Sequence, residues 1–135
     1  MRYLEIIEQE ATDMIHAFSL RDKFDKFSEA WRPKIIGEVN DMHVKVSKLR
    51  GEFIWHRHEN EDELFYLVKG RMEIRLKDQD AVVLREGDMT IIPRGVDHKP
   101  FAADEAWVMV IERKTTVNTG NRTDSDRTVP APEWI

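Results

Sequence analysis

Residues 51–70 read GEFIWHRHENEDELFYLVKG. His56 and His58 stand two residues apart, so on an extended strand both side chains leave from the same face. The acidic residues 59–62 are typical of a turn, and Glu63 opens the next apolar run. We therefore expect two neighbouring strands from which two imidazoles and one carboxylate converge on a common point.

Residues 87–100 read GDMTIIPRGVDHKP and bring a third imidazole. Pro93 and Gly95 predict a tight turn, after which His98 starts another strand. A lone His-x-His pair is often two surface histidines, so neither segment is specific by itself. The combined spacing is H-x-H-x4-E-x6-G, then sixteen residues, then G-x5-P-x-G-x2-H, and chance seldom supplies it. It singles out four residues: His56, His58, Glu63 and His98.

Short apolar runs surround these two segments from about residue 31 to residue 112. They are rich in Val, Ile, Leu and Phe, and turn-forming Gly, Pro, Asp and Asn separate them. The expected strands are 35–39, 43–49, 53–56, 63–68, 72–76, 81–84, 89–92 and 107–111. Many short strands with no helix between them predict an all-β fold, a sandwich or barrel of the jelly-roll type.

We expect a single domain over residues 1–135 in three parts: an N-terminal segment 1–30, a barrel 31–112 and a C-terminal tail 113–135. Apolar residues at three- and four-residue steps predict a short amphipathic helix in the first part: Leu4, Ile7, Ala11, Met14 and Phe18. The tail is polar but ends in Trp134 and Ile135. We expect this apolar pair to hold the tail along the barrel or on a neighbouring subunit.

Composition narrows the partners and the ligands. A net charge of −5, with Lys and Arg scattered among acidic residues, disfavours nucleic acid and anionic membranes as partners. Cysteine is absent, so a metal ion has only nitrogen and oxygen ligands available. Four acidic residues within the first twenty are incompatible with the apolar core of a signal peptide: Glu5, Glu8, Glu10 and Asp13. Since no apolar run approaches the ~20 residues of a membrane span, we expect a cytoplasmic protein.

In these residues the chain resembles the cupin superfamily. The first cupin motif matches His56, His58, Glu63 and Gly70, and the second matches Gly87, Pro93, Gly95 and His98. The resemblance implies a double-stranded β-helix, or jelly-roll barrel, in which His56, His58, Glu63 and His98 bind one divalent metal ion. Two positions depart from the motifs: Gly51 lies one residue nearer the histidine pair, and Ala102 stands where asparagine is common. Neither is a ligand position.

The chain as a whole is similar to small stand-alone cupins loosely called mannose-6-phosphate-isomerase-like, a label that describes a barrel and not an activity. Imidazole and carboxylate ligands suit iron, manganese, nickel, cobalt, copper or zinc. Four protein ligands in an octahedral shell leave about two positions for a substrate or oxygen. The alternative to a metal site is a hydrogen-bonded cluster of the same four residues with no metal. Glu63 is the expected carboxylate ligand, and the nearby Glu59, Glu61 and Asp62 are expected to be solvated turn residues.

Strand parity predicts what surrounds the site. If Glu63 points inward, Phe65 and Leu67 follow it, whereas Leu64, Tyr66 and Val68 point outward. The expected lining is mainly apolar, with no inward Lys or Arg, which favours a small apolar or aromatic organic acid or diketone over a phosphorylated sugar. The apolar outer residues indicate that something covers this face. The resemblance to cupins implies a second subunit, and therefore a homodimer, with coverage by the chain's own N-terminal helix as the alternative.

Two functions fit these features. The first is a metal-dependent enzyme on a small organic molecule, either an oxygenase or a Lewis-acid isomerase or lyase. The second is a non-catalytic small-molecule-binding or sensing module. Tyr66 and Arg94 lie near the motifs in sequence, but no catalytic proton-transfer residue can be assigned.

Overall fold

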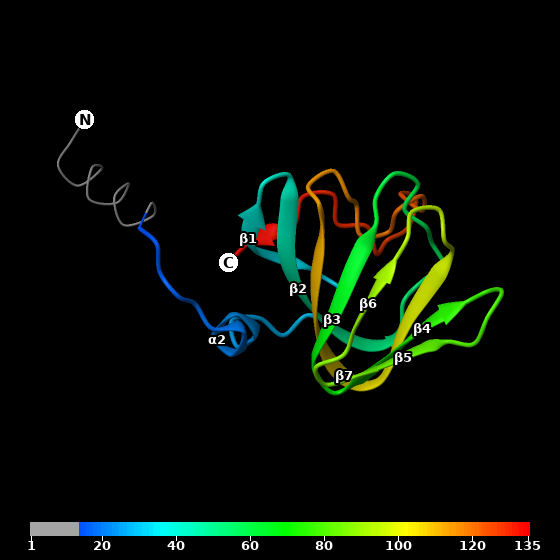
Figure 1. Ribbon diagram of the computed structural model, residues 1–135, viewed down its shortest axis with the longest axis horizontal. Helices are drawn as coiled ribbons and strands as arrows, with labels where there is room; N and C mark the ends of the chain where they lie inside the picture. Colours follow the sequence, from blue (N-terminus) through cyan, green and yellow to red (C-terminus); the bar gives the residue numbers. More distant parts are fainter. Residues whose placement is uncertain (1–13) are drawn as a thin grey trace.

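The computed structural model describes residues 14–135 and is built almost entirely of β-strands (Figure 1). Its single short helix in the described part, α2, spans Leu20–Phe24. The strands are β1 (Lys34–Val39), β2 (Met42–Glu52), β3 (Glu63–Lys69), β4 (Arg71–Leu76), β5 (Val82–Arg85), β6 (Met89–Ile92), β7 (His98–Arg113) and β8 (Glu133–Trp134). None of the helices among the described residues has the length and apolar character needed to cross a membrane.

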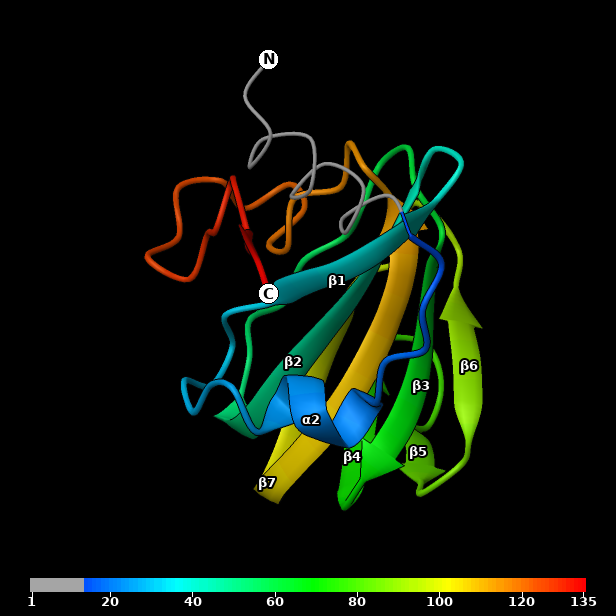
Figure 2. The same cartoon turned by 90° about the vertical axis from the view of Figure 1, so that its left-hand side faces the viewer.

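Strand β7 connects the two halves of the barrel. It pairs with β2, β3 and β4, all antiparallel, and so belongs to both the path β5-β4-β7-β2-β1-β8 and the branch that continues through β3 to β6. The sheet curls around an interior, as Figure 2 shows. This is the jelly-roll barrel that the strand pattern predicts.

The barrel interior follows the two-residue alternation of its strands. On β3, Glu63, Phe65 and Leu67 are buried, and the residues between them are only half-buried. Met72 and Ile74 on β4 face the same core. The predicted inward and outward parity of β3 is therefore confirmed, and β4 alternates in the same way, because one face of each strand packs against the core.

Helix α2 covers part of the outer face of the barrel (Figure 2). Ser19 caps its first turn by accepting a hydrogen bond from the Asp22 amide, and Phe24 is fully buried. The Phe24 ring stacks on Trp107 with centroids 4.8 Å apart. Val68 and Met109 pack against the same cluster, so the chain itself covers the outward Val68.

The predicted short helical segment within residues 1–30 is confirmed by α2, but the helix does not include the two expected residues that can be compared. Met14 and Phe18 precede α2, lie outside any helix and are exposed. The apolar spacing extends into α2 only at Leu20 and Phe24, where burial against the barrel stabilises a short turn of helix. Leu4, Ile7 and Ala11 lie outside the described residues.

Two further predictions about strands need correction. Residues 53–56 form no strand, because Gly51 adopts a left-handed φ of 74° and shifts the register of β2 against β7. Only His56 remains paired there, in an isolated bridge with His98. The expected strand 107–111 is the second half of the much longer β7.

In the tail, β8 runs parallel to β1. Of the two expected positions for the tail, along the barrel or on a neighbouring subunit, the structure therefore has the first.

Candidate metal centre

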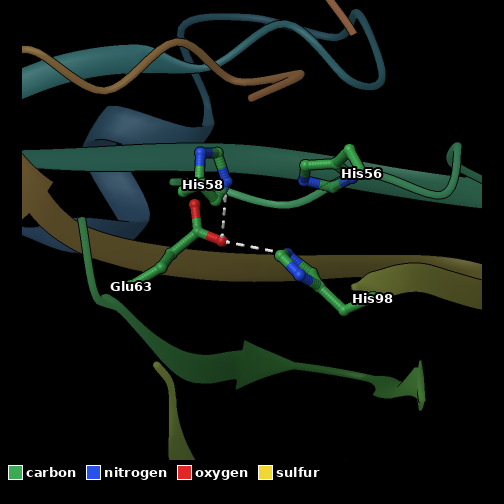
Figure 3. Close-up of side chains that lie close together, drawn as sticks. All are labelled: His56, His58, Glu63 and His98. Atoms are coloured by element: carbon green, nitrogen blue, oxygen red, sulfur yellow. Dashed lines mark ion pairs between the residues drawn. The ribbon is translucent and has the colours of Figure 1, made fainter. Parts of the chain in front are cut away.

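The four residues singled out by sequence lie together inside the barrel (Figure 3). His56 and His58 follow the end of β2, Glu63 is the first residue of β3, and His98 is the first residue of β7. All four are buried, and one potential ligand atom from each lies within 4.8 Å of the others. Residues far apart in the chain thus meet at one point.

His56 and His98 are oriented by the same backbone arrangement. Their backbones exchange two hydrogen bonds, 3.1 and 2.9 Å long, which place the two rings side by side. The Nδ1 atom of His56 lies 2.9 Å from the Ile54 carbonyl oxygen, and Nδ1 of His98 lies 2.9 Å from that of Val96. A carbonyl only accepts, so each Nδ1 donates, and the Nε2 lone pair of each ring is left for another ligand.

Glu63 lies between His58 and His98, as the dashed lines in Figure 3 show. Its Oε1 atom is 3.4 Å from Nε2 of each ring. Among the described residues, Glu63 Oε1 and the Nε2 atoms of His58 and His98 are buried with no hydrogen-bond partner. Buried polar atoms left unpaired are costly, and one cation satisfies all of them at once. The donor set therefore fits a divalent transition metal ion.

The electrostatics of the cluster favour a neutral His56 and an ionised Glu63, the states in which these groups bind a metal ion. Burial, followed by the neighbouring His98, lowers the pKa of His56 to about 4, so this ring is neutral at pH 7. Burial acts to raise the pKa of Glu63, but the adjacent Glu112 carboxyl and the His58 and His98 rings outweigh it and hold that pKa well below its usual range. Burial likewise opposes protonation of His58, yet Glu63 raises the pKa of this ring overall.

The C-terminal tail holds the histidine segment in place, a role that the sequence did not indicate. Asn121 and Arg57 exchange two hydrogen bonds of 2.9 Å, one through the Asn121 side chain. Gly120 has a φ of 55°, and a Cβ there would collide with the Arg57 carbonyl oxygen and come within 3.2 Å of His58 Nδ1. The only available signal was the Asn-Thr-Gly-Asn turn at 118–121, which does not reveal its partner.

A cavity of about 530 Å³, including its open mouth, lies beside the cluster, and His56 and Glu63 line it. Its walls are mainly apolar, as expected, and include Trp31, Phe53 and Phe65. The expectation that no Lys or Arg points inward is wrong, because Lys45 lines this cavity and is 2% exposed. The sequence does not reveal it, because the partner that allows its burial is distant in the chain: Lys45 Nζ lies 3.0 Å from Glu112 Oε1.

Glu112 is a second buried carboxylate that the sequence did not single out. It lies directly opposite Glu63 in the β3–β7 ladder. Burial and the adjacent Glu63 charge raise its pKa well above the usual range, against the effect of Lys45. Lys45 and Glu112 thus place a polar pair next to the Glu63 carboxylate.

Other residues near the motifs lie away from the cluster. Glu61 accepts a hydrogen bond from Thr115, and Asp62 accepts one from the Arg94 amide, both 2.9 Å long at the surface. Glu59 is exposed and pairs with Arg57. These three carboxylates are solvated turn residues, as expected, and Tyr66 points to the outer side of β3.

A jelly-roll barrel with a buried cluster of three histidines and a glutamate defines a class of metal-site β-barrels. The chain matches the cupin domain family over residues 42–112, which contain all four cluster residues, and it belongs to that family. The finer mannose-6-phosphate-isomerase-like assignment stays a prediction.

Three relatives illustrate the match. The uncharacterized protein YdbB of Bacillus subtilis (strain 168) is 41% identical over 79 residues, which cover 58% of this chain and 70% of that protein. A 3-hydroxyanthranilate 3,4-dioxygenase 2 of Aspergillus fumigatus is 31% identical over 90 residues, 63% of this chain, and the match spans only 47% of that enzyme. The crystal structure of a cupin-2 domain containing protein from Shewanella frigidimarina NCIMB 400 has a TM-score of 0.71 at 40% identity, covering 78% of this chain and 99% of that one.

Proposed function

We propose that His56, His58, Glu63 and His98 hold one divalent transition metal ion and that the protein is a metal-dependent enzyme acting on a small organic molecule. The carrying observation is the position of the buried cluster at the wall of an apolar cavity, where His56 and Glu63 face the space a substrate would enter. A bound ion supplies a Lewis acid, or a redox centre if it is iron, manganese, nickel, cobalt or copper.

The chain's own residues perform three tasks in this proposal. The Ile54 and Val96 carbonyls fix the rings of His56 and His98 so that their Nε2 atoms face inward. The apolar walls around Phe53 and Phe65 exclude water from a bound molecule. The third task is to present polar atoms to the cavity, and the Lys45–Glu112 pair does this. It is the only buried Lys–carboxylate contact at the cavity among the described residues.

Among the possible reactions, we propose an oxygenase ahead of a Lewis-acid isomerase or lyase. The similarity to a 3-hydroxyanthranilate 3,4-dioxygenase over 63% of this chain supports this order. The small apolar cavity supports the same order, because it suits an aromatic ring better than a sugar.

We further propose that the protein is a homodimer in the cytoplasm. An apolar outer patch on β3 and β6, formed by Leu64, Tyr66, Met89 and Ile91, supports the dimer. Met89 and Ile91 are 59% and 58% exposed in one chain, and helix α2 packs elsewhere on the outer face. The cytoplasmic location rests on the sequence alone and stays a prediction.

The test begins with elemental analysis of protein purified without added metal. We expect close to one transition metal ion per chain in the wild type and in His43→Ala, a matched control whose imidazole lies outside the cluster, edge-on to Trp134. His56→Ala and His98→Ala should fold but lose the metal. Zinc would shift the proposal toward the isomerase or lyase, and iron toward the oxygenase.

Activity is then tested by oxygen consumption of the iron-loaded chain with 3-hydroxyanthranilate and related ring compounds. We expect turnover in the wild type and in His43→Ala and none in His98→Ala. Turnover unchanged in the metal-free variants contradicts the proposal. A small molecule that copurifies and is released unchanged from metal-loaded protein favours the sensing module instead.

A further inference from the structure

Arg127, on the C-terminal tail, is a cation with no counter-ion among the described residues. Its Nη1 atom is buried, and among residues 14–135 it has neither a hydrogen-bond partner nor an ion pair with a carboxylate. Arginine stays charged at any physiological pH, and its guanidinium is built to bind a carboxylate through two parallel hydrogen bonds. Leaving one of its donors buried and unpaired is costly unless another group completes the contact.

Three residues of the cavity wall hold Arg127. The guanidinium carbon lies 5.8 Å from the ring centroids of both Trp31 and Phe53. Asn118 donates a hydrogen bond of 2.8 Å to the Arg127 carbonyl and accepts one of 2.8 Å from Val129. Trp31, Phe53 and Asn118 all line the cavity. Arg127 is not itself a lining residue but lies against this part of the wall, which we call the rim.

The aromatic pair under Arg127 connects the rim to the metal centre. Trp31 and Phe53 stack with centroids 4.9 Å apart, and the Phe53 ring meets the His56 ring edge-on at 5.3 Å. Flat apolar walls of this kind favour a flat apolar ligand. A ligand on these walls would extend from His56 toward Arg127.

Trp31 is held in a conformation that a bulky residue rarely adopts. Its φ is 63°, in the left-handed region, and two hydrogen bonds fix it there. The Trp31 amide donates to the Lys48 carbonyl and its indole nitrogen to the Arg50 carbonyl, both at 2.8 Å. Strain of this kind gathers at binding sites, where the surrounding structure maintains it.

Lys45, the other cation at the cavity, does not offer an unpaired donor for a carboxylate. Its ammonium donors are already engaged, because Nζ donates to Glu112 Oε1 at 3.0 Å and to the Thr116 carbonyl at 3.5 Å. Among the described residues, the buried cationic donor left without a partner is therefore that of Arg127, at the rim. The metal-ligand cluster lies at a different part of the cavity wall, where His56 and Glu63 line it.

Building on the function proposed above, we propose that Arg127 binds the carboxylate of the substrate, and that the substrate class is a small aromatic carboxylate. Its ring lies along Trp31 and Phe53, with the end opposite the carboxylate directed at the metal centre. Arg127 is a binding residue in this assignment and takes no part in proton transfer.

The experiment compares two probes that differ by one carboxylate, catechol and 3,4-dihydroxybenzoate, on the full chain loaded with redox-inert Zn²⁺. Isothermal titration calorimetry gives both affinities, and elemental analysis checks the metal content of every variant. We expect the wild type to bind 3,4-dihydroxybenzoate about ten- to a hundredfold tighter than catechol, the range of a charge-assisted hydrogen-bond pair. Arg127→Gln should bring this ratio close to one and leave catechol affinity within about twofold.

Two variants separate recognition from a general effect of charge or folding. Arg122→Gln removes an exposed arginine of the same tail, paired with Asp124 at 3.4 Å, and should keep the wild-type ratio. Arg127→Lys keeps the charge without the planar fork and should fall between the wild type and Arg127→Gln. Equal ratios in the wild type and Arg127→Gln overturn the inference, as does a failure of both probes to bind zinc-loaded protein.

A second experiment distinguishes a failure of the Arg127 assignment from a failure of the proposed metal-dependent function. Benzoate and benzamide are titrated into metal-free protein and followed by NMR shifts of the Trp31 indole. A preference for benzoate that disappears in Arg127→Gln supports the inference even in a chain that takes up no metal. A chain that binds one zinc ion but shows no such preference refutes the inference alone.

Discussion

His56 shows how one residue acquires its role from its surroundings. Its ring is held by the Ile54 carbonyl at 2.9 Å, is pressed edge-on by Phe53, and is 3% exposed. Removal from water disfavours the charged imidazolium, which is why the pKa of His56 falls to about 4. A ring held neutral in this way is ready to act as a ligand at physiological pH.

The lowered pKa of His56 predicts a pH dependence of the metal-free protein. The unfolded chain takes up this proton near pH 6.5 and the folded chain only near pH 4, so the unfolded state binds more protons between them. Stability should therefore fall with decreasing pH, and between pH 7 and pH 5 His56 should account for about 2 kcal/mol. Urea unfolding of the wild type and His56→Gln at both pH values measures this difference. Identical pH dependences in the two proteins would contradict it.

Gly120 is the second residue whose surroundings determine its role. Gly120→Ala forces an L side chain into a left-handed φ and against Arg57 and His58. We expect a loss of about 2–4 kcal/mol of stability, the sum of backbone strain and overpacking, together with about tenfold weaker metal binding from the displaced His58.

Gly87→Ala is the matched control for this substitution. Its φ is 89°, but no atom lies within 4 Å of the added Cβ, so only the strain of about 1–2 kcal/mol should appear and metal binding should not change. Chemical denaturation and metal titration compare the two variants. An equal effect of both on metal binding would show that contact with His58 is unimportant.

At the scale of elements, the tail and α2 pack on a barrel whose strands are already paired. The tail fixes the histidine segment through Asn121 and adds β8 to β1. Helix α2 has only 5 residues, too few to be stable alone, and depends on the stacking of Phe24 on Trp107. Both elements are therefore products of tertiary packing.

Phe24→Ala should destabilise the protein by about 3–5 kcal/mol, because a fully buried ring is replaced by a cavity. Phe18→Ala removes a ring that is 52% exposed and should change stability by less than about 1 kcal/mol. Thermal unfolding followed by circular dichroism compares the two variants. A small effect of Phe24→Ala would mean that α2 does not contribute to the stability of the barrel.

At the scale of the whole molecule, the outer face divides into a covered part and an open part. Helix α2 packs over Trp107 and Val68, whereas Met89 and Ile91 on β6 are exposed and lie opposite Tyr66 and Leu64. An apolar surface on neighbouring strands is typical of a subunit interface. The sequence analysis gave two alternatives for what covers the outer face, a partner subunit or the chain's own N-terminal helix. Helix α2 covers only the side at Trp107 and Val68 and leaves Met89 and Ile91 exposed.

The open side of this face predicts a concentration-dependent dimer. Ile91→Lys places a charge in the outer patch and should shift the protein to a monomer, with the fold and the metal content unchanged because Ile91 points away from the core. Size-exclusion chromatography with light scattering measures the mass. A monomeric wild type refutes the dimer, and a dimer that persists in Ile91→Lys places the interface elsewhere.

The sequence alone determined the barrel and the four clustered residues, because both follow from local rules. Strand parity assigns Phe65 to the core, and motif spacing selects the cluster residues His56, His58, Glu63 and His98. The strand limits around Gly51 were less predictable, since a single left-handed residue shifts the register.

Only the tertiary structure decided which distant residues complete the site. Gly120 against His58, Lys45 against Glu112 and Arg127 above Trp31 are contacts between segments far apart in the chain. Neither periodicity nor spacing encodes them, because each depends on where the folded barrel brings the tail and the strands together. A buried lysine or a rim arginine looks like any surface cation until its partner, or the lack of one among the described residues, is seen in space.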